Sequence, residues 1–102
     1  NVTNVPSQSL ALMNDPIFHQ QARVWAERLL KETGEGADPG ARVAWLFRTA
    51  YGRPPARSET AACVEALDGF RGLHPAAEEQ RLEPWVDLCH ALLNANDFIY
   101  VK

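Results

Sequence analysis

Residues 15–33, with the sequence DPIFHQQARVWAERLLKET, decide the fold because their apolar side chains recur at helical spacing. The stripe steps by four, three and four positions, which places its members on one face of a helix. They are Phe18, Ala22, Trp25 and Leu29, flanked by Ile17, Val24 and Leu30. Asp15-Pro16 supplies the start, since aspartate accepts hydrogen bonds from free N–H groups and proline suits the first turn. With Gly34 as the stop, the pattern predicts a long amphipathic helix from Pro16.

The same signals recur toward the C-terminus. Asp38-Pro39 starts a second helix, and Gly52 ends it at a position that needs left-handed backbone. Ser58 is the expected cap of the next helix, and Pro84 opens the last one. A polar helical turn is expected over residues 76–81.

The two ends complete the prediction. Residues 1–6 read as an extended segment, and Ser7 is expected to cap a short helix over residues 8–13. Residues 98–101, FIYV, form a short apolar tail. Since no longer stretch alternates with the period of a strand, the sequence predicts an all-α, compact bundle of about five helices with short Pro/Gly loops.

Composition limits the function classes. The chain has 102 residues, of which 46% are hydrophobic and 23% are charged, so we expect residues 1–102 to form a single helical domain. The apolar runs are too short to insert into a membrane. The net charge of −3 argues against a nucleic-acid partner. Because the chain begins with Asn1 rather than Met, we interpret it as a C-terminal fragment of a larger chain.

Cys63 and Cys89 lie 26 positions apart, without a second Cys or His at zinc-binding spacing. Two interpretations stay open: two buried free thiols, or one disulfide that ties two helices together. No metal site is expected, and no cofactor is expected in this chain.

The sequence shows no catalytic motif: the serines lie at helix starts, and neither a nucleophile elbow nor a phosphate-binding loop is present. The three histidines, His19, His74 and His90, have no second His or Cys four positions away. We interpret His90 as a partly buried, hydrogen-bonded structural residue. Trp45, Tyr51 and Trp85 are candidate aromatics for docking a partner or stacking on a carbohydrate.

Three segments carry a resemblance to a known family. Residues 3–16, TNVPSQSLALMNDP, resemble the pattern T-N-x-P-x-Q-A-L-x-L-L-N-D-P. Residues 46–55, LFRTAYGRPP, resemble L-Y-R-x-x-x-G-R-x-P, and residues 87–101, DLCHALLNANDFIYV, resemble D-L-x-x-x-L-L-N-x-N-E-F-x-Y-V. Together they are similar to the C-terminal region, of unknown function, of large planctomycete proteins that often carry an N-terminal cytochrome c domain. Ser9 and Asp97 depart from the pattern, where Ala and Glu are usual.

The resemblance implies export to a periplasmic or extracellular space, which favours the disulfide, but it implies no activity. The haem-binding CxxCH of such proteins is absent from this sequence, so no haem ligand is assigned here. The polar residues of the two end segments form a candidate cluster, namely Asn4, Gln8, Asn14, Asp15, Asn94, Asn96 and Asp97. The first hypothesis is a non-catalytic module that packs against the remainder of the parent polypeptide. The alternatives are a fragment that completes an enzyme site and a carbohydrate- or surface-binding module.

Overall fold

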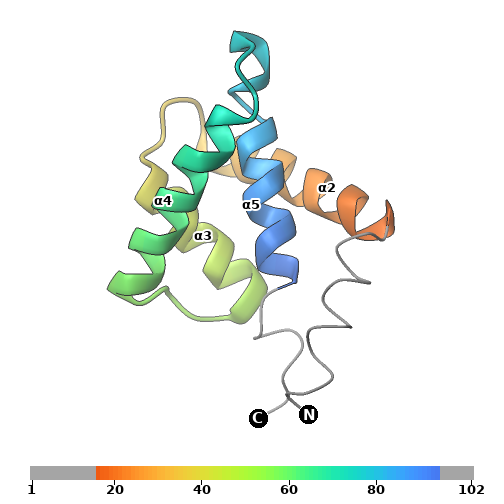
Figure 1. Ribbon diagram of the computed structural model, residues 1–102. Coiled ribbons are helices and arrows are strands. Elements are labelled where there is room, and N and C mark those ends of the chain that lie inside the picture. The colour runs from red at the N-terminus through yellow and green to blue at the C-terminus, as the bar shows by residue number, and fades with distance from the viewer. Residues whose placement is uncertain (1–15, 95–102) are drawn as a thin grey trace, which may run out of the picture.

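The computed structural model describes residues 16–94, which form four α-helices and one short 3-10 turn. The helices are α2 (Pro16–Thr33), α3 (Pro39–Tyr51), α4 (Arg57–Gly72) and α5 (Glu83–Leu93), and the turn η2 (Ala77–Glu79) precedes α5 (Figure 1). No strand occurs within this range. The all-α prediction is confirmed, with four helices described where about five were expected. The predicted extended segment 1–6, helix 8–13 and tail 98–101 lie outside the described residues.

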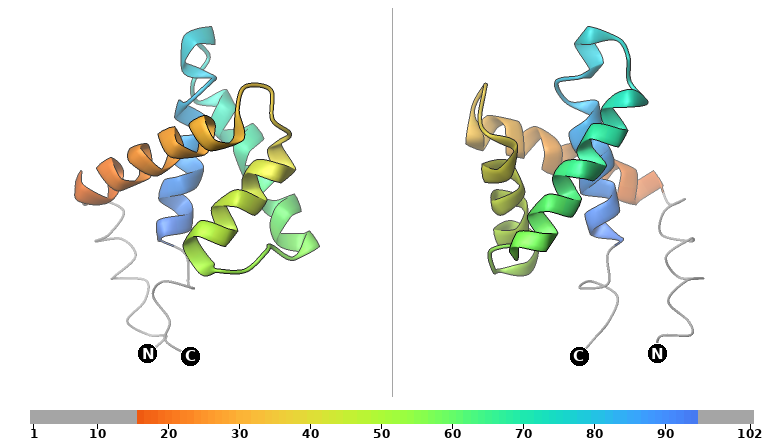
Figure 2. Two further views of the ribbon diagram at one scale, coloured as in Figure 1. Left: turned by 180° about the vertical axis from the view of Figure 1, so that it is seen from behind. Right: turned by 60° about the vertical axis from the view of Figure 1, so that its left-hand side comes forward.

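Helix α5 is the centre of the bundle. It packs against α2 on one side and α4 on the other, while α3 completes the arrangement by contacting α2 and α4. Figure 2 shows α2 crossing α5 obliquely, with α4 on the opposite side of α5. The buried positions of α5 are Pro84, Trp85, Val86, Leu88, Cys89 and Leu92. A helix that is apolar on most of its faces is one that neighbours cover on most sides.

The buried face of α2 is rotated about the helix axis relative to the predicted stripe. Ala22 and Leu29 are buried as expected, but Ala26 and Leu30 join them, while Phe18 and Trp25 are only half-buried. Small alanines on the contact face let two helix backbones approach closely, which favours this face over one centred on bulky Trp25. The face left outside carries Val24 in an exposed position.

Two predicted helix ends are confirmed in atomic detail. The Asp38 Oδ2 accepts hydrogen bonds from the N–H groups of Gly40 at 2.9 Å and Ala41 at 3.3 Å, which caps α3. Gly52 follows α3 with a φ of 71°, and its N–H donates to the Arg48 carbonyl oxygen.

The predicted Ser58 cap is wrong. Helix α4 begins at Arg57, with Ala56 in the capping position, two residues earlier than a cap at Ser58 would place it. The Glu59 carboxylate supplies the reverse contact of a capping box, because its Oε1 accepts the N–H of the capping residue Ala56 at 2.7 Å. The guanidinium of Arg53 holds that carboxylate through two hydrogen bonds of 2.8 and 2.9 Å.

Residues 73–82, which we call the projecting segment, connect α4 to α5 and extend beyond the ends of the helices (Figures 1 and 2). They contain η2, which is shorter than the polar turn predicted over residues 76–81. Leu73 at the start of the segment is 69% exposed.

Candidate functional site

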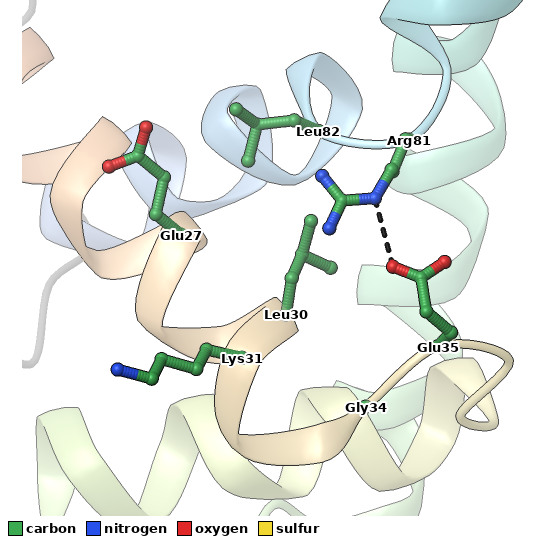
Figure 3. Close-up of a pocket in the computed structure, with 7 residues that line it drawn as sticks. All are labelled: Glu27, Leu30, Lys31, Gly34, Glu35, Arg81 and Leu82. Carbon is green, nitrogen blue, oxygen red and sulfur yellow. Dashed lines mark hydrogen bonds and ion pairs between the residues drawn. The ribbon is translucent and has the colours of Figure 1, made fainter.

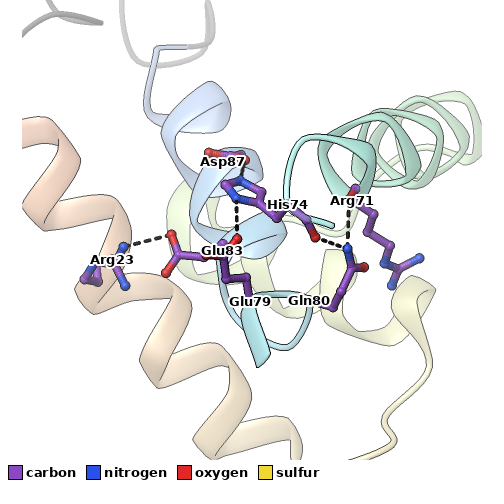
Figure 4. A network of polar contacts seen from close by, with 7 residues as sticks. All are labelled: Arg23, Arg71, His74, Glu79, Gln80, Glu83 and Asp87. Atoms are coloured by element: carbon purple, nitrogen blue, oxygen red, sulfur yellow. Dashed lines mark hydrogen bonds and ion pairs between the residues drawn. The ribbon is translucent and has the colours of Figure 1, made fainter. Parts of the chain in front are cut away.

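His74 of the projecting segment lies at the centre of a polar network (Figure 4). Its Nε2 is 2.7 Å from the Asp87 Oδ2 on α5, and its Nδ1 is 3.7 Å from the Glu79 Oε1 on η2. The hydrogen bond to Asp87 raises the pKa of His74, and the charges of Asp87, Glu79 and Glu83 raise it further. Both ring nitrogens therefore face carboxylates, which is the arrangement that a doubly protonated imidazolium satisfies.

The network extends to α2 and α4. Glu83 accepts a hydrogen bond of 2.9 Å from the Arg23 guanidinium, which lowers the pKa of Glu83. The Gln80 side-chain amide donates to the Arg71 carbonyl oxygen at 2.8 Å and to the His74 carbonyl oxygen. These contacts tie the projecting segment to the end of α4 and to the start of α5.

A second candidate site is a small groove on the outer side of α2, with a volume of about 220 Å³. Its lining comes from α2, α3 and α5 and consists of Gln21, Val24, Trp25, Arg28, Thr49 and Leu93. The Trp25 indole N–H donates to the Thr49 Oγ1 at 3.0 Å, which fixes the ring at the junction of α2 and α3. Val24 is 57% exposed, and Ile17, two turns earlier on the same helix, is 60% exposed.

A third depression of about 500 Å³ lies where α2 meets the projecting segment (Figure 3). Leu30 and Leu82 give it an apolar wall, and the ion pair between Arg81 Nε and Glu35 Oε2, 3.0 Å long, spans one side. Both partners of this pair are exposed to solvent, where such ion pairs contribute little free energy. The remaining lining residues are Glu27, Lys31 and Gly34.

The two other histidines meet between α2 and α5. The rings of His19 and His90 stack with centroids 4.1 Å apart. Burial lowers the pKa of His90, and the neighbouring His19 lowers it further. The interpretation of His90 as partly buried is confirmed. Its Nε2 is buried without a hydrogen-bond partner among the described residues. Residues 16–94 also contain no group of three or more His, Cys, Asp or Glu side chains that would bind a metal ion.

Only one residue of the predicted polar cluster lies within the described residues. Asn94 ends α5, and its side-chain amide donates to the His90 carbonyl oxygen at 2.8 Å. Its Oδ1 is buried without a partner in the described part of the chain. The other six members, Asn4, Gln8, Asn14, Asp15, Asn96 and Asp97, lie outside the described residues.

The three predicted docking aromatics take different positions. Trp85 is 2% exposed, so its prediction as a docking residue is wrong: α5 is covered on several sides, and the Arg42 guanidinium lies over the ring at 5.5 Å. Tyr51 is half-buried, and its hydroxyl donates to the Leu92 carbonyl oxygen at 3.0 Å. Trp45 is half-buried beneath the Arg28 guanidinium at 5.8 Å.

Cys63 and Cys89 are both buried and both free, so the disulfide alternative is not realised. Burial raises the pKa of each thiol, most strongly at Cys89. A thiol held neutral in this way is a poor nucleophile. The two cysteines therefore act as small core side chains.

The sequence motifs missed the His74 network and the α2 groove. His74 and Asp87 are 13 positions apart, and no motif links them before the projecting segment is seen to fold back on α5. The groove has a weak signal in the sequence, because Ile17 and Val24 already flanked the predicted core stripe.

Comparison with known proteins gives a family. No helix within residues 16–94 has the length and apolar content needed to cross a membrane. None of the curated proteins matches the chain, and no solved structure matches it either. Residues 1–67 of the 102 match the family described as PSD1, protein of unknown function (DUF1553). This match includes α2 and α3 and ends within α4. The chain is therefore a member of the PSD1 (DUF1553) family of unknown function.

Proposed function

We propose that this chain is a non-catalytic docking module, whose α2 outer face binds the remainder of a larger polypeptide. The observation that carries the proposal is the exposed apolar side chain of Val24 beside a groove with Trp25 and Leu93 in its lining. Large apolar side chains gathered next to a groove are typical of protein-binding surfaces.

The composition of this surface fits a protein partner. Its lining combines apolar and polar side chains, namely Val24, Trp25 and Leu93 with Gln21, Arg28 and Thr49. Tryptophan and arginine are enriched among the residues that dominate binding energy, and a polar rim around an apolar centre is the usual anatomy of an interface. The hydrogen bond from Trp25 to Thr49 fixes the ring before binding, which reduces the entropy that association costs.

The remainder of the parent polypeptide is the occupant that we favour. The family match extends over α2 and α3, the two helices that supply Trp25 and Thr49, so most of the surface lies within the matched residues, and only its α5 contribution, Leu93, lies outside them. The resemblance of residues 3–16 to a segment inside large proteins supports a connection on the N-terminal side of α2.

The test uses the full-length protein with an engineered protease site immediately before this chain. After cleavage, gel filtration of the wild-type protein should show the module co-eluting with the rest. Val24→Glu places a charge at the centre of the surface, so most of the module should elute separately.

Leu73→Glu is the matched control, because it makes the same kind of change at another exposed position and should leave the module bound. Circular dichroism of both variants establishes that they fold. Separation of the wild-type module after cleavage would contradict the proposal, as would a Val24→Glu module that stays bound.

The biological setting is part of the proposal. We infer that the parent protein is an exported planctomycete-type protein, with a cytochrome c domain toward its N-terminus. The three family-like segments of the sequence support this inference. Fractionation of the native host with an antibody against this chain is the test: recovery in the periplasmic or extracellular fraction is expected, and recovery in the cytoplasmic fraction alone would overturn it.

A further inference from the structure

We propose that His74 is a pH-sensitive clasp that holds the projecting segment against α4 and α5, and that the segment loosens when His74 loses its proton. This inference concerns a different part of the molecule from the α2 surface and stands independently of the proposed function. The protonation state of one side chain, His74, then sets the conformation of the projecting segment.

The geometry of the clasp favours the protonated ring. A neutral imidazole has one N–H donor and one acceptor, whereas the imidazolium has two donors. In this structure the Nε2 lies 2.7 Å from the Asp87 Oδ2, and the Nδ1 lies 3.7 Å from the Glu79 Oε1. A neutral ring that donates to Asp87 turns its lone pair toward the carboxylate of Glu79, which is a repulsive arrangement.

The charged groups around His74 are mostly acidic. Helix α5 contributes Asp87 and Glu83, and η2 contributes Glu79. On the side of α2, Arg23 is paired with Glu83 at 2.9 Å. On the side of α4, Arg71 pairs with Asp68 at 3.1 Å.

His90 also lies on α5, three positions after Asp87, and the Asp87 charge reaches it as well. Its pKa is shifted downward, opposite to that of His74. The two histidines therefore titrate in different pH ranges, which makes His90 a useful internal control.

Backbone hydrogen bonds hold the two ends of the projecting segment, and Leu82 packs against the core, so the side-chain contacts concern the residues between these ends. Gln80 bonds to the Arg71 and His74 carbonyl oxygens, and Arg81 pairs with Glu35 in an exposed position. Among the side chains of the segment, His74 makes the direct ionic link to α5. Its deprotonation replaces an ion pair with the Asp87 carboxylate by a weaker hydrogen bond from the neutral ring to the same carboxylate.

Loosening of the projecting segment changes the depression shown in Figure 3, because the segment supplies part of its lining. The segment supplies Arg81 and Leu82 to the lining, while Leu30 comes from α2. Release of the clasp therefore moves one wall of this depression relative to the other. The direction of the response follows from the raised pKa: the clasp is closed at mildly acidic pH and opens as the pH rises through the His74 midpoint.

The experiment measures hydrogen-exchange protection factors of residues 75–82 in the 102-residue chain between pH 5.5 and 8.5. A protection factor divides out the intrinsic pH dependence of exchange. We expect protection to fall by about threefold to tenfold as His74 loses its proton, from the difference between charged and neutral hydrogen bonds. The His74 ring signals in an NMR titration give the midpoint, which should coincide with this loss.

Two variants keep the proposal falsifiable. His74→Gln retains hydrogen bonding without the charge, so protection should be low at every pH and show no step. Asp87→Asn should move the His74 midpoint downward and the protection step with it. His90→Gln is the matched control, and its step should stay at the wild-type pH. The proposal is overturned if wild-type protection is flat across this range, or if the step persists in His74→Gln.

Discussion

The carboxylate of Glu59 performs two structural tasks at the start of α4. It accepts the Ala56 N–H at 2.7 Å, and it pairs with both terminal nitrogens of Arg53. These contacts lower its pKa from 4.5 to about 2. Because the pKa is lower in the folded state, the ionised carboxylate adds stability above the ordinary pKa, and this stability is lost as the pH falls toward 2.

Glu59→Gln is the corresponding prediction at the residue scale. The glutamine still offers an oxygen to the Ala56 N–H but has no charge for Arg53. Urea unfolding between pH 2 and 6 should therefore show a smaller loss of stability at acidic pH than in the wild type. Equal losses in both proteins would contradict the role assigned to this carboxylate.

At the scale of the elements, glycines show how backbone conformation sets the helix ends. Gly52 follows α3 with a φ of 71°, whereas Gly69 lies inside α4, and an added methyl group would meet no atom within 4 Å at either site. Gly52→Ala should cost about 1 kcal/mol, since its only penalty is left-handed backbone. Gly69→Ala should stabilise the fold by roughly 0.5–1 kcal/mol. Thermal unfolding measures both, and a stabilising Gly52→Ala would refute this account of the helix end.

Helix ends that depend on local chemistry were predictable from the sequence. Asp38, Pro39 and Gly52 act within a few residues of themselves, so their pattern alone defines α3. The start of α4 was predicted two residues late, because its capping contact depends on Arg53 reaching Glu59 from outside the helix. The core face of α2 was only partly predicted, since the choice between Ala26 and Trp25 depends on how closely α5 approaches.

At the scale of the whole molecule, one shared core joins the four helices. Leu67 and Leu73 allow a buried and an exposed leucine to be compared. Leu67 of α4 is 0% exposed, while Leu73 is 69% exposed. Leu67→Ala should lower the free energy of unfolding by about 2–5 kcal/mol, through lost burial and the cavity left behind. Leu73→Ala should change it by less than about 0.5 kcal/mol. Denaturant titration tests both, and similar losses in the two variants would show that the core is misassigned.

The candidate sites were less predictable than the fold. The His74–Asp87 pair forms only because the projecting segment folds back on α5, which no local pattern encodes. Trp85 was proposed as a docking residue, but it is buried in the core because neighbouring helices cover α5 on several sides. Most of the predicted polar cluster lies outside residues 16–94, so it stays a prediction.

The central claim is that the outer face of α2 is a docking surface, and side-chain footprinting by hydroxyl radicals tests it most directly. The measurement compares the oxidation rate of Val24 in the 102-residue chain with its rate in the full-length protein, and Leu73 serves as the exposed reference. We predict that Val24 becomes several-fold less reactive in the full-length protein while Leu73 keeps its rate. An unchanged rate at Val24 would contradict the claim.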